Sequence, residues 1–213
     1  MTTLVKICGI NSPEALDAAA DAGADYIGFV FFPPSPRAVT PAQAAAISTH
    51  RPGGPARVGL FVDPTDDDVA EALASLALDV LQVHGTAGRA VELRTRFGAP
   101  VWVASGVGGA DDLPTDDGGV DALLLDAKAP PGAPLPGGNA RAFDWSVLRG
   151  WTAPAPWLLA GGLTPDNVAE AVRVSGASAV DVSSGVERSR GVKDPVLIQA
   201  FVRNARARSS PAA

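Results

Sequence analysis

Short apolar runs recur along this chain, and each is followed by a segment whose apolar residues repeat with a helical period. Runs of this length, rich in Val, Ile and Leu, are typical of strands buried in a parallel sheet. Eight strands are predicted, at residues 4–8, 26–31, 58–62, 80–84, 101–104, 122–126, 157–160 and 179–183. Helices are predicted between or after them at 13–22, 41–50, 66–76, 89–97, 165–175 and 195–207, several of which follow a Ser, Thr or Asp and open with Pro or an acidic turn.

This alternation predicts an α/β protein with parallel strands joined by right-handed crossovers, and eight such units suit a (β/α)8 TIM barrel. An open doubly wound sheet is the alternative. A single barrel domain is expected over residues 1–208, with a tail at 209–213 that frays. A helix within 109–119 is only weakly indicated, and the Pro- and Gly-rich stretch 129–138 predicts a long loop after the sixth strand.

Composition narrows the range of partners. The 213 residues carry a formal net charge of -6, which argues against nucleic acid as a partner because a phosphate-backbone binder needs a basic face. The first ten residues hold only a short apolar stretch, interrupted by Lys6. That stretch is too short for a membrane span or a signal peptide, so a cytoplasmic protein that does not contact membrane is expected.

Polar residues gather on one face of several predicted strands. Alternate residues of a barrel strand face inward, and the polar ones share a parity: Lys6 and Cys8, Gln82 and His84, Asp181 and Ser183, and Asp126. Any one of them is explained equally well as a buried polar group satisfied by its neighbours. Four strands that end in such groups predict convergence at the C-terminal end of the barrel, where active sites of this fold lie.

Cys8 is the only cysteine of the chain and stands at the end of the first predicted strand. Without an intrachain partner it forms no structural disulfide, which leaves packing, metal ligation or chemistry. Its position alone favours core packing, since free cysteine is among the most buried residue types.

Two turns of small residues follow the seventh and eighth strands and contain Gly161 and Gly162, and Ser183, Ser184 and Gly185. Glycine lets backbone amides approach an oxyanion closely, and the loops after strands seven and eight commonly form the phosphate site of this barrel. A phosphorylated small molecule is therefore expected as ligand. Neither turn has the spacing of a nucleotide-binding loop or of a serine nucleophile elbow.

The sequence Lys-Ile-Cys-Gly stands at 6–9 and Ser-Ser-Gly-Val-Glu at 183–187, and between them, in order, lie motifs at 23–31, 58–62, 81–85, 123–126 and 143–145. In this set of motifs the chain resembles the phosphoribosylanthranilate isomerase family of tryptophan biosynthesis. The resemblance implies an Amadori rearrangement of N-(5-phosphoribosyl)anthranilate that needs no cofactor. By this resemblance Cys8 is the general base, as thiolate, and Asp126 the general acid, as neutral carboxyl. The site is then expected to lower the pKa of the cysteine, with help from Lys6, and to raise that of the aspartate.

Further residues receive roles from the same resemblance. Arg37 matches the arginine that binds the anthranilate carboxylate, and a guanidinium suits that group because it pairs bidentately. Asp181 matches an aspartate near the substrate or, equally, a partner for Lys6, while Gln82 and His84 are expected to shape the site rather than to transfer protons. In the loop before Phe143, Ala140 stands where the family has a glycine.

The sequence leaves two rival functions. The related isomerase of histidine biosynthesis performs the same rearrangement on another amine, but it would need a carboxylate in place of Cys8. A phosphate-binding barrel without catalytic activity would keep the glycine turns and have no use for both Cys8 and Asp126. The oligomeric state, monomer or homodimer, does not follow from the sequence.

Overall fold

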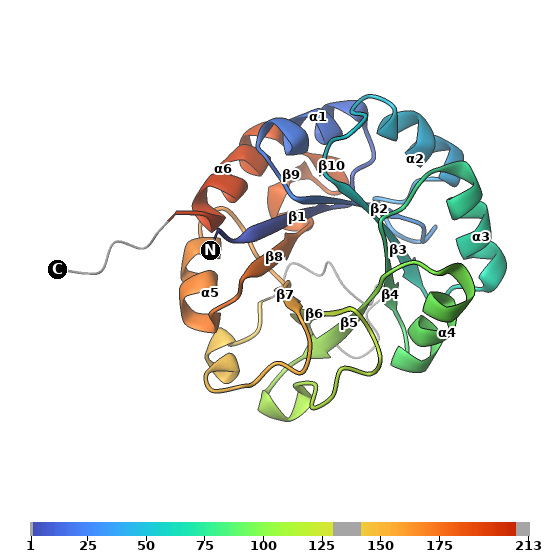
Figure 1. Cartoon of the computed structure of the whole chain (residues 1–213). Helices are drawn as coiled ribbons and strands as arrows, with labels where there is room; N and C mark the ends of the chain where they lie inside the picture. Colours follow the sequence, from blue (N-terminus) through green and yellow to red (C-terminus); the bar gives the residue numbers. More distant parts are fainter. Residues whose placement is uncertain (1, 130–141, 208–213) are drawn as a thin grey trace.

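The computed structural model describes residues 2–129 and 142–207, and within them eight parallel strands close into a barrel in the order β1 to β8 (Figure 1). The strands are β1 Leu4–Cys8, β2 Tyr26–Val30, β3 Ala56–Val62, β4 Val80–His84, β5 Val101–Val107, β6 Ala122–Ala127, β7 Trp157–Leu159 and β8 Ala179–Val182. Because β1 pairs with both β2 and β8, the sheet has no edge. The predicted (β/α)8 barrel is confirmed, and the open doubly wound sheet is excluded.

Helices pack around the outside of this barrel (Figure 1). They are α1 Pro13–Asp21, α2 Pro41–Ser48, α3 Asp66–Ser75, α4 Ala87–Phe97, α5 Val168–Ser175 and α6 Pro195–Ala205. A polar residue before each of α1, α2, α3, α4 and α6 accepts a backbone hydrogen bond as an N-cap, as the sequence indicated, whereas Asn167 accepts none from α5. The side chains of Thr40 and Thr65 each accept a hydrogen bond from the backbone N–H three residues on. The side chains of Gln43 and Asp68 in turn accept one from the backbone N–H of Thr40 and Thr65, which completes two capping boxes.

The connections after β5 and β7 differ from the prediction. Between β5 and β6 the weakly indicated helix is a single 3-10 turn, Ala110–Asp112. The Asp112 carboxylate accepts from the Gly108 amide and pairs with Lys128, so it ties the turn to the strand ends. After β7, helix α5 begins at Val168 rather than at residue 165, because the Asn167 side chain holds Thr164 in a turn ahead of it.

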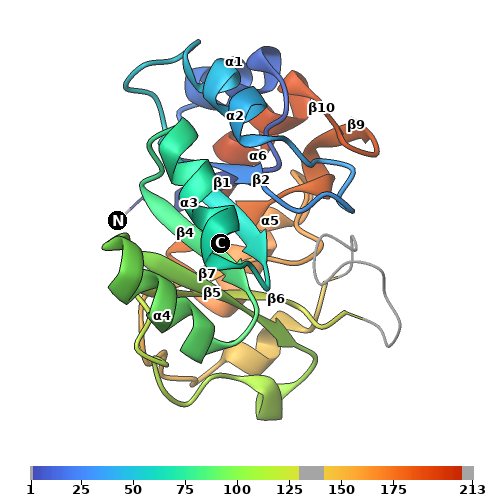
Figure 2. The same cartoon turned by 90° about the vertical axis from the view of Figure 1, so that its right-hand side faces the viewer.

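A hairpin that the sequence analysis missed follows β8. It consists of β9 Glu187–Ser189 and β10 Val192–Lys193, paired antiparallel, with Gly191 at φ +81° in the turn. Figure 2 shows this hairpin at the end of the barrel opposite to the N-terminus. It therefore stands beside the C-terminal ends of the strands.

The predicted side-chain parity of the strands is confirmed. Outward-facing residues such as Val5 and Ile7 pack under the helices. The barrel interior is filled by a separate apolar group, Val58, Val80, Trp102, Ala122, Leu124, Leu158, Ala160 and Ala179. The polar Lys6, Gln82 and Asp181 are buried at 0%, 1% and 8% exposure, so the interior changes from apolar to polar toward one end.

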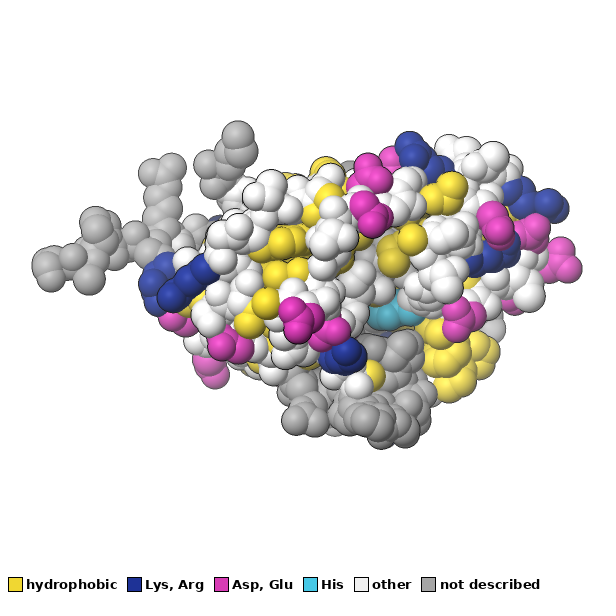
Figure 3. Space-filling model, turned by 90° about the horizontal axis from the view of Figure 1, so that it is seen from below, with side chains coloured by type: hydrophobic (Ala, Val, Ile, Leu, Met, Phe, Trp, Pro, Cys, Tyr) yellow, Lys and Arg dark blue, Asp and Glu magenta, His cyan; other side chains and the backbone are white. Residues whose placement is uncertain are grey.

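Three predicted features lie outside the described residues: most of the long loop at 129–138, the position of Ala140, and the tail at 209–213. In the described part of the chain no helix is long and apolar enough to cross a membrane. On the face shown in Figure 3, acidic and basic side chains are interspersed.

Candidate active site

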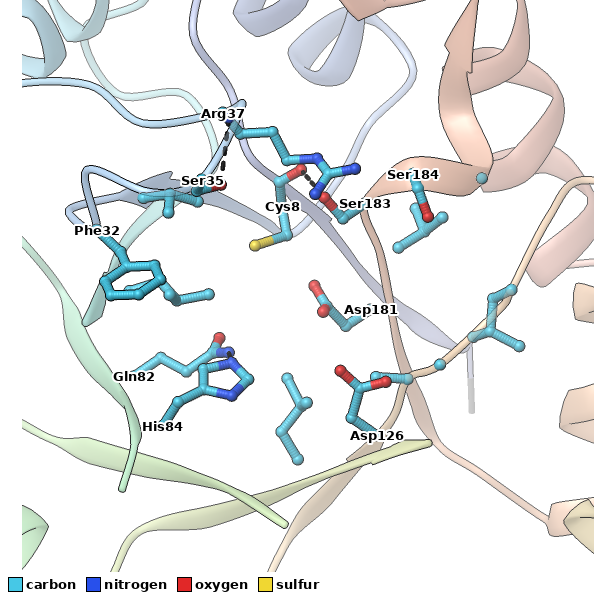
Figure 4. Close-up of a pocket in the computed structure, with 18 of the residues that line it drawn as sticks. Cys8, Phe32, Ser35, Arg37, Gln82, His84, Asp126, Asp181, Ser183 and Ser184 are labelled. Carbon is cyan, nitrogen blue, oxygen red and sulfur yellow. Dashed lines mark hydrogen bonds between the residues drawn. The ribbon is translucent and has the colours of Figure 1, made fainter. Parts of the chain in front are cut away.

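One pocket opens at the C-terminal ends of the strands, and every predicted site residue lines it (Figure 4). These residues come from five different segments of the chain: Cys8, Arg37, Asp126, Gly161, Gly162, Asp181, Ser183, Ser184 and Gly185. Gln82 and His84 form part of the same wall. The barrel thus brings together the residues that the sequence analysis selected separately.

Cys8 ends β1 and is 4% exposed. Gly28, which pairs with it on β2, leaves the space that the thiol needs, since a Cβ there would lie 3.0 Å from Cys8 Sγ and 3.3 Å from Lys6 Nζ. Directly after Cys8 the chain turns at Gly9, whose φ of +80° suits glycine. The strand end and the two glycines place the sulfur at the pocket surface with little freedom.

Burial raises the pKa of the Cys8 thiol, and the ammonium groups of Lys6 and Lys193 only partly oppose this effect. The expectation that the surroundings lower this pKa is therefore wrong, because desolvation is the largest effect. Lys6 is itself buried and donates to Asp181 at 2.8 Å. Burial acts to lower the pKa of Lys6, but Asp181 and Cys8 outweigh it and raise that pKa. The Lys6 side chain therefore remains charged at physiological pH and lies next to the thiol.

Asp126 approaches the pocket from β6. Its Oδ1 accepts a hydrogen bond of 2.8 Å from the backbone of Ala127. Gly161 packs against the same carboxylate, because a Cβ at that position would lie 2.9 Å from Oδ1. The carboxyl thus lies beside the first glycine turn and leaves no room there for a side chain at position 161.

The two glycine turns meet at one side of the pocket. Gly161 and Gly162 have φ values of +85° and +61°, and Asn167 fixes their loop by donating to the Gly162 carbonyl at 2.9 Å. A Cβ at Gly185 would overlap the carbonyl oxygen of Leu163. Only glycine at 185 lets the loops after β7 and β8 approach this closely, which shapes a narrow, backbone-lined cradle.

Arg37 extends over Cys8 from the loop after β2 (Figure 4). Its Nε and Nη2 donate to the two carboxylate oxygens of Glu187 at 2.6 and 3.1 Å. Both side chains are almost fully buried, at 7% and 4% exposure. Burial opposes ionisation, yet Arg37, Lys193 and the Gly191 amide hold the pKa of Glu187 at about 2. The carboxylate is ionised throughout the physiological range.

Lys193 completes this cluster from β10. It donates to Glu187 Oε1 at 3.0 Å and to the carbonyl of Ser183 at 2.8 Å. Neither Glu187 nor Lys193 was predicted from the sequence to have a role. The only signal for Glu187 was its place at the end of the Ser-Ser-Gly-Val-Glu motif, and Lys193 looks like any surface lysine before a helix.

Comparison with known proteins agrees with this geometry. Residues 5–204 match the family model of N-(5'-phosphoribosyl)anthranilate (PRA) isomerase. The chain belongs to the phosphoribosylanthranilate isomerase family. A relative with that name from Granulibacter bethesdensis is 56% identical over 209 residues, which cover 96% of this chain and 100% of that protein.

Solved structures of phosphoribosylanthranilate isomerases share the fold. One, in complex with reduced 1-(o-carboxyphenylamino)-1-deoxyribulose 5-phosphate, superimposes with a TM-score of 0.81 at 33% identity, covering 95% of this chain and 98% of that one. Another, of monomers generated from the dimeric enzyme of Thermotoga maritima, has a TM-score of 0.79 at 34% identity, with the same coverage. Membership in the isomerase family thus rests on sequence and on backbone geometry.

Proposed function

We propose that this pocket catalyses the Amadori rearrangement of N-(5-phosphoribosyl)anthranilate, with Cys8 as general base and Asp126 as general acid. The observation that carries these roles is the common pocket: a thiol and a carboxyl from strands far apart in sequence border it together with the glycine cradle. The product, 1-(2-carboxyphenylamino)-1-deoxyribulose 5-phosphate, is an isomer of the substrate, and no cofactor is required.

The reaction needs two proton transfers. In the first, Asp126 protonates the ring oxygen while the aryl nitrogen lone pair forms a C1=N bond, so the C1–O bond breaks and an iminium results. In the second, the Cys8 thiolate takes the proton from C2, and the electron pair forms a C1=C2 bond that neutralises the nitrogen. The resulting enol then moves its hydroxyl proton to C1 and becomes the ketone.

Two anchors hold the substrate for these steps. We assign the substrate phosphate to the cradle of Gly161, Gly162, Ser183, Ser184 and Gly185, because closely approaching loop backbones with small residues suit an oxyanion. We assign the anthranilate carboxylate to Arg37. Glu187 occupies two of the five N–H groups of that guanidinium, and the other three have no partner among the described residues.

The alternative functions are less well supported. The histidine-pathway reaction would need a carboxylate where Cys8 stands, and a binder without activity gives no reason for Cys8 and Asp126 to border one pocket. The ligand proposed is a phosphorylated small molecule. Assembly as monomer or homodimer, a cytoplasmic location, and the absence of nucleic-acid and membrane partners all remain predictions from the sequence.

Loss of anthranilate fluorescence on mixing substrate with protein tests this function directly. We expect turnover by the wild-type protein and severe loss in Cys8→Ser and in Asp126→Asn, together with rescue of a tryptophan auxotroph that lacks this step by wild type alone. Near-normal turnover in either variant removes that residue from its role. Binding of substrate by wild type without any fluorescence loss would favour the non-catalytic alternative.

A further inference from the structure

Gln82 carries a polar atom that the protein itself does not satisfy. The residue lies on β4, 1% exposed, and lines the pocket. Its Nε2 is 3.5 Å from Nε2 of His84, whereas its buried Oε1 has no hydrogen-bond partner within residues 2–129 and 142–207. Figure 4 shows this oxygen pointing away from His84. Buried carbonyl groups in proteins are nearly always paired, so an unpaired one at a pocket wall indicates a ligand group that donates a hydrogen bond.

His84 fixes which part of the amide is available. Burial and the nearby ammonium of Lys6 lower the pKa of His84 to about 4, so its imidazole is neutral and carries one proton at physiological pH. A neutral ring nitrogen that accepts from the amide Nε2 leaves the amide oxygen free toward the pocket. Lys6 acts on the pKa of both His84 and Cys8. This indicates that Gln82 and His84 on β4 face the same part of the barrel interior as the thiol.

The substrate has two kinds of hydrogen-bond donor, the sugar hydroxyls and the aryl N–H, and the ortho carboxylate of its own ring accepts from the N–H. Strand β4 lies across the barrel from β8 and its part of the phosphate cradle (Figure 1). A substrate with its phosphate in the cradle therefore directs the other end of its sugar toward Gln82. The anthranilate carboxylate accepts hydrogen bonds but donates none, and it is assigned to Arg37. The sugar hydroxyls donate.

We propose that the Gln82 side-chain carbonyl accepts a hydrogen bond from the C2 hydroxyl of the substrate sugar, and that His84 orients the amide for this contact. The proposal rests on the proposed function, and it concerns the carbon that loses its proton to Cys8. Carbon 2 has four substituents. Binding of the phosphate in the glycine cradle fixes the position of C3, and binding of the anthranilate carboxylate by Arg37 fixes that of C1. With Gln82 holding the hydroxyl, three of the four substituents are fixed. The hydrogen on C2 then has a single direction, toward the thiol.

Binding of matched ligands by matched variants tests this contact. The probes are the reduced product analogue, which carries a hydroxyl at C2, and two counterparts that lack the hydroxyl at C2 or at C3. The variants are Gln82→Met, which keeps the side-chain length without hydrogen-bonding groups, and Gln82→Glu, which keeps an acceptor. Dissociation constants are measured by titration, and thermal unfolding confirms that each variant is folded.

We expect removal of the C2 hydroxyl to weaken binding about tenfold in wild type and in Gln82→Glu, but to have no effect in Gln82→Met. Removal of the C3 hydroxyl is expected to weaken binding by the same factor in all three proteins. The inference is overturned if removal of the C2 hydroxyl weakens binding equally in wild type and in Gln82→Met. It is also overturned if the loss of affinity on removal of the C3 hydroxyl depends on Gln82. If wild type binds none of the probes and does not turn over substrate, the proposed function itself fails.

Discussion

Arg37 and Glu187 form a bidentate, buried ion pair across 150 residues of sequence, with N–O distances of 2.6 and 3.1 Å. The pair joins the loop after β2 to the β9–β10 hairpin, and Lys193 extends it to the backbone of Ser183. The arginine assigned to one end of the substrate is thereby linked to the loop assigned to its phosphate. One carboxylate thus connects the two ends of the proposed binding site.

Replacing Glu187 by Gln is expected to raise KM by roughly tenfold with a much smaller change in kcat, because Arg37 loses its charge-assisted partner and its orientation. Steady-state kinetics on folded protein measure this split. Glu170→Gln is the matched control, since Glu170 pairs with Arg173 in an exposed ion pair far less buried than that of Glu187. An unchanged KM in Glu187→Gln would show that Arg37 does not need this partner.

The titration of Cys8 should limit the rate at low pH. The thiol must be deprotonated to act as base, so kcat/KM rises as pH rises through its pKa. Burial raises this pKa, and the rising limb is therefore expected above the ordinary thiol value of about 8.5. Because the chain has one cysteine, thiolate absorbance in the ultraviolet reports Cys8 alone, with Cys8→Ser as blank. A thiolate signal that is complete at neutral pH contradicts this expectation.

The sequence was sufficient to predict the barrel and most of the residues that line the candidate site. Strands of alternating parity place Cys8, Gln82 and Asp181 inward, and the fold then brings their C-terminal ends together without further information. The glycine turns could be predicted as a phosphate site because they follow two successive strands, the seventh and the eighth, where this fold commonly binds phosphate.

What the sequence did not reveal depends on contacts between distant segments. The β9–β10 hairpin has strands of three and two residues in a polar stretch, too short for a periodic pattern. Burial of Lys193 and the role of Glu187 follow from that hairpin. The raised pKa of Cys8 was missed for a similar reason, because desolvation in a closed barrel outweighs the nearby ammonium that the sequence did show.

Gly185→Ala is expected to disrupt the cradle. The added Cβ would overlap the Leu163 carbonyl, so the loops after β7 and β8 must move apart. We expect the affinity for inorganic phosphate and for substrate to fall at least about tenfold, which calorimetry and KM measure. Gly88→Ala in α4 is the control, because nothing lies within 4 Å of its added Cβ and alanine favours a helix. Equal phosphate affinity in both variants would place the phosphate elsewhere.

The Lys6–Asp181 pair allows a separate test of stability. With Lys6 fully buried, Lys6→Met leaves the Asp181 carboxylate without its ammonium and is expected to cost about 3–5 kcal/mol of unfolding free energy. Lys6→Met combined with Asp181→Leu removes both charges and should recover most of that loss, as measured by urea denaturation. The double variant also lacks the ammonium beneath Cys8, so its activity should remain low when its stability returns. A double variant as unstable as Lys6→Met would mean that packing around the lysine stem, not the unpaired charge, sets the cost.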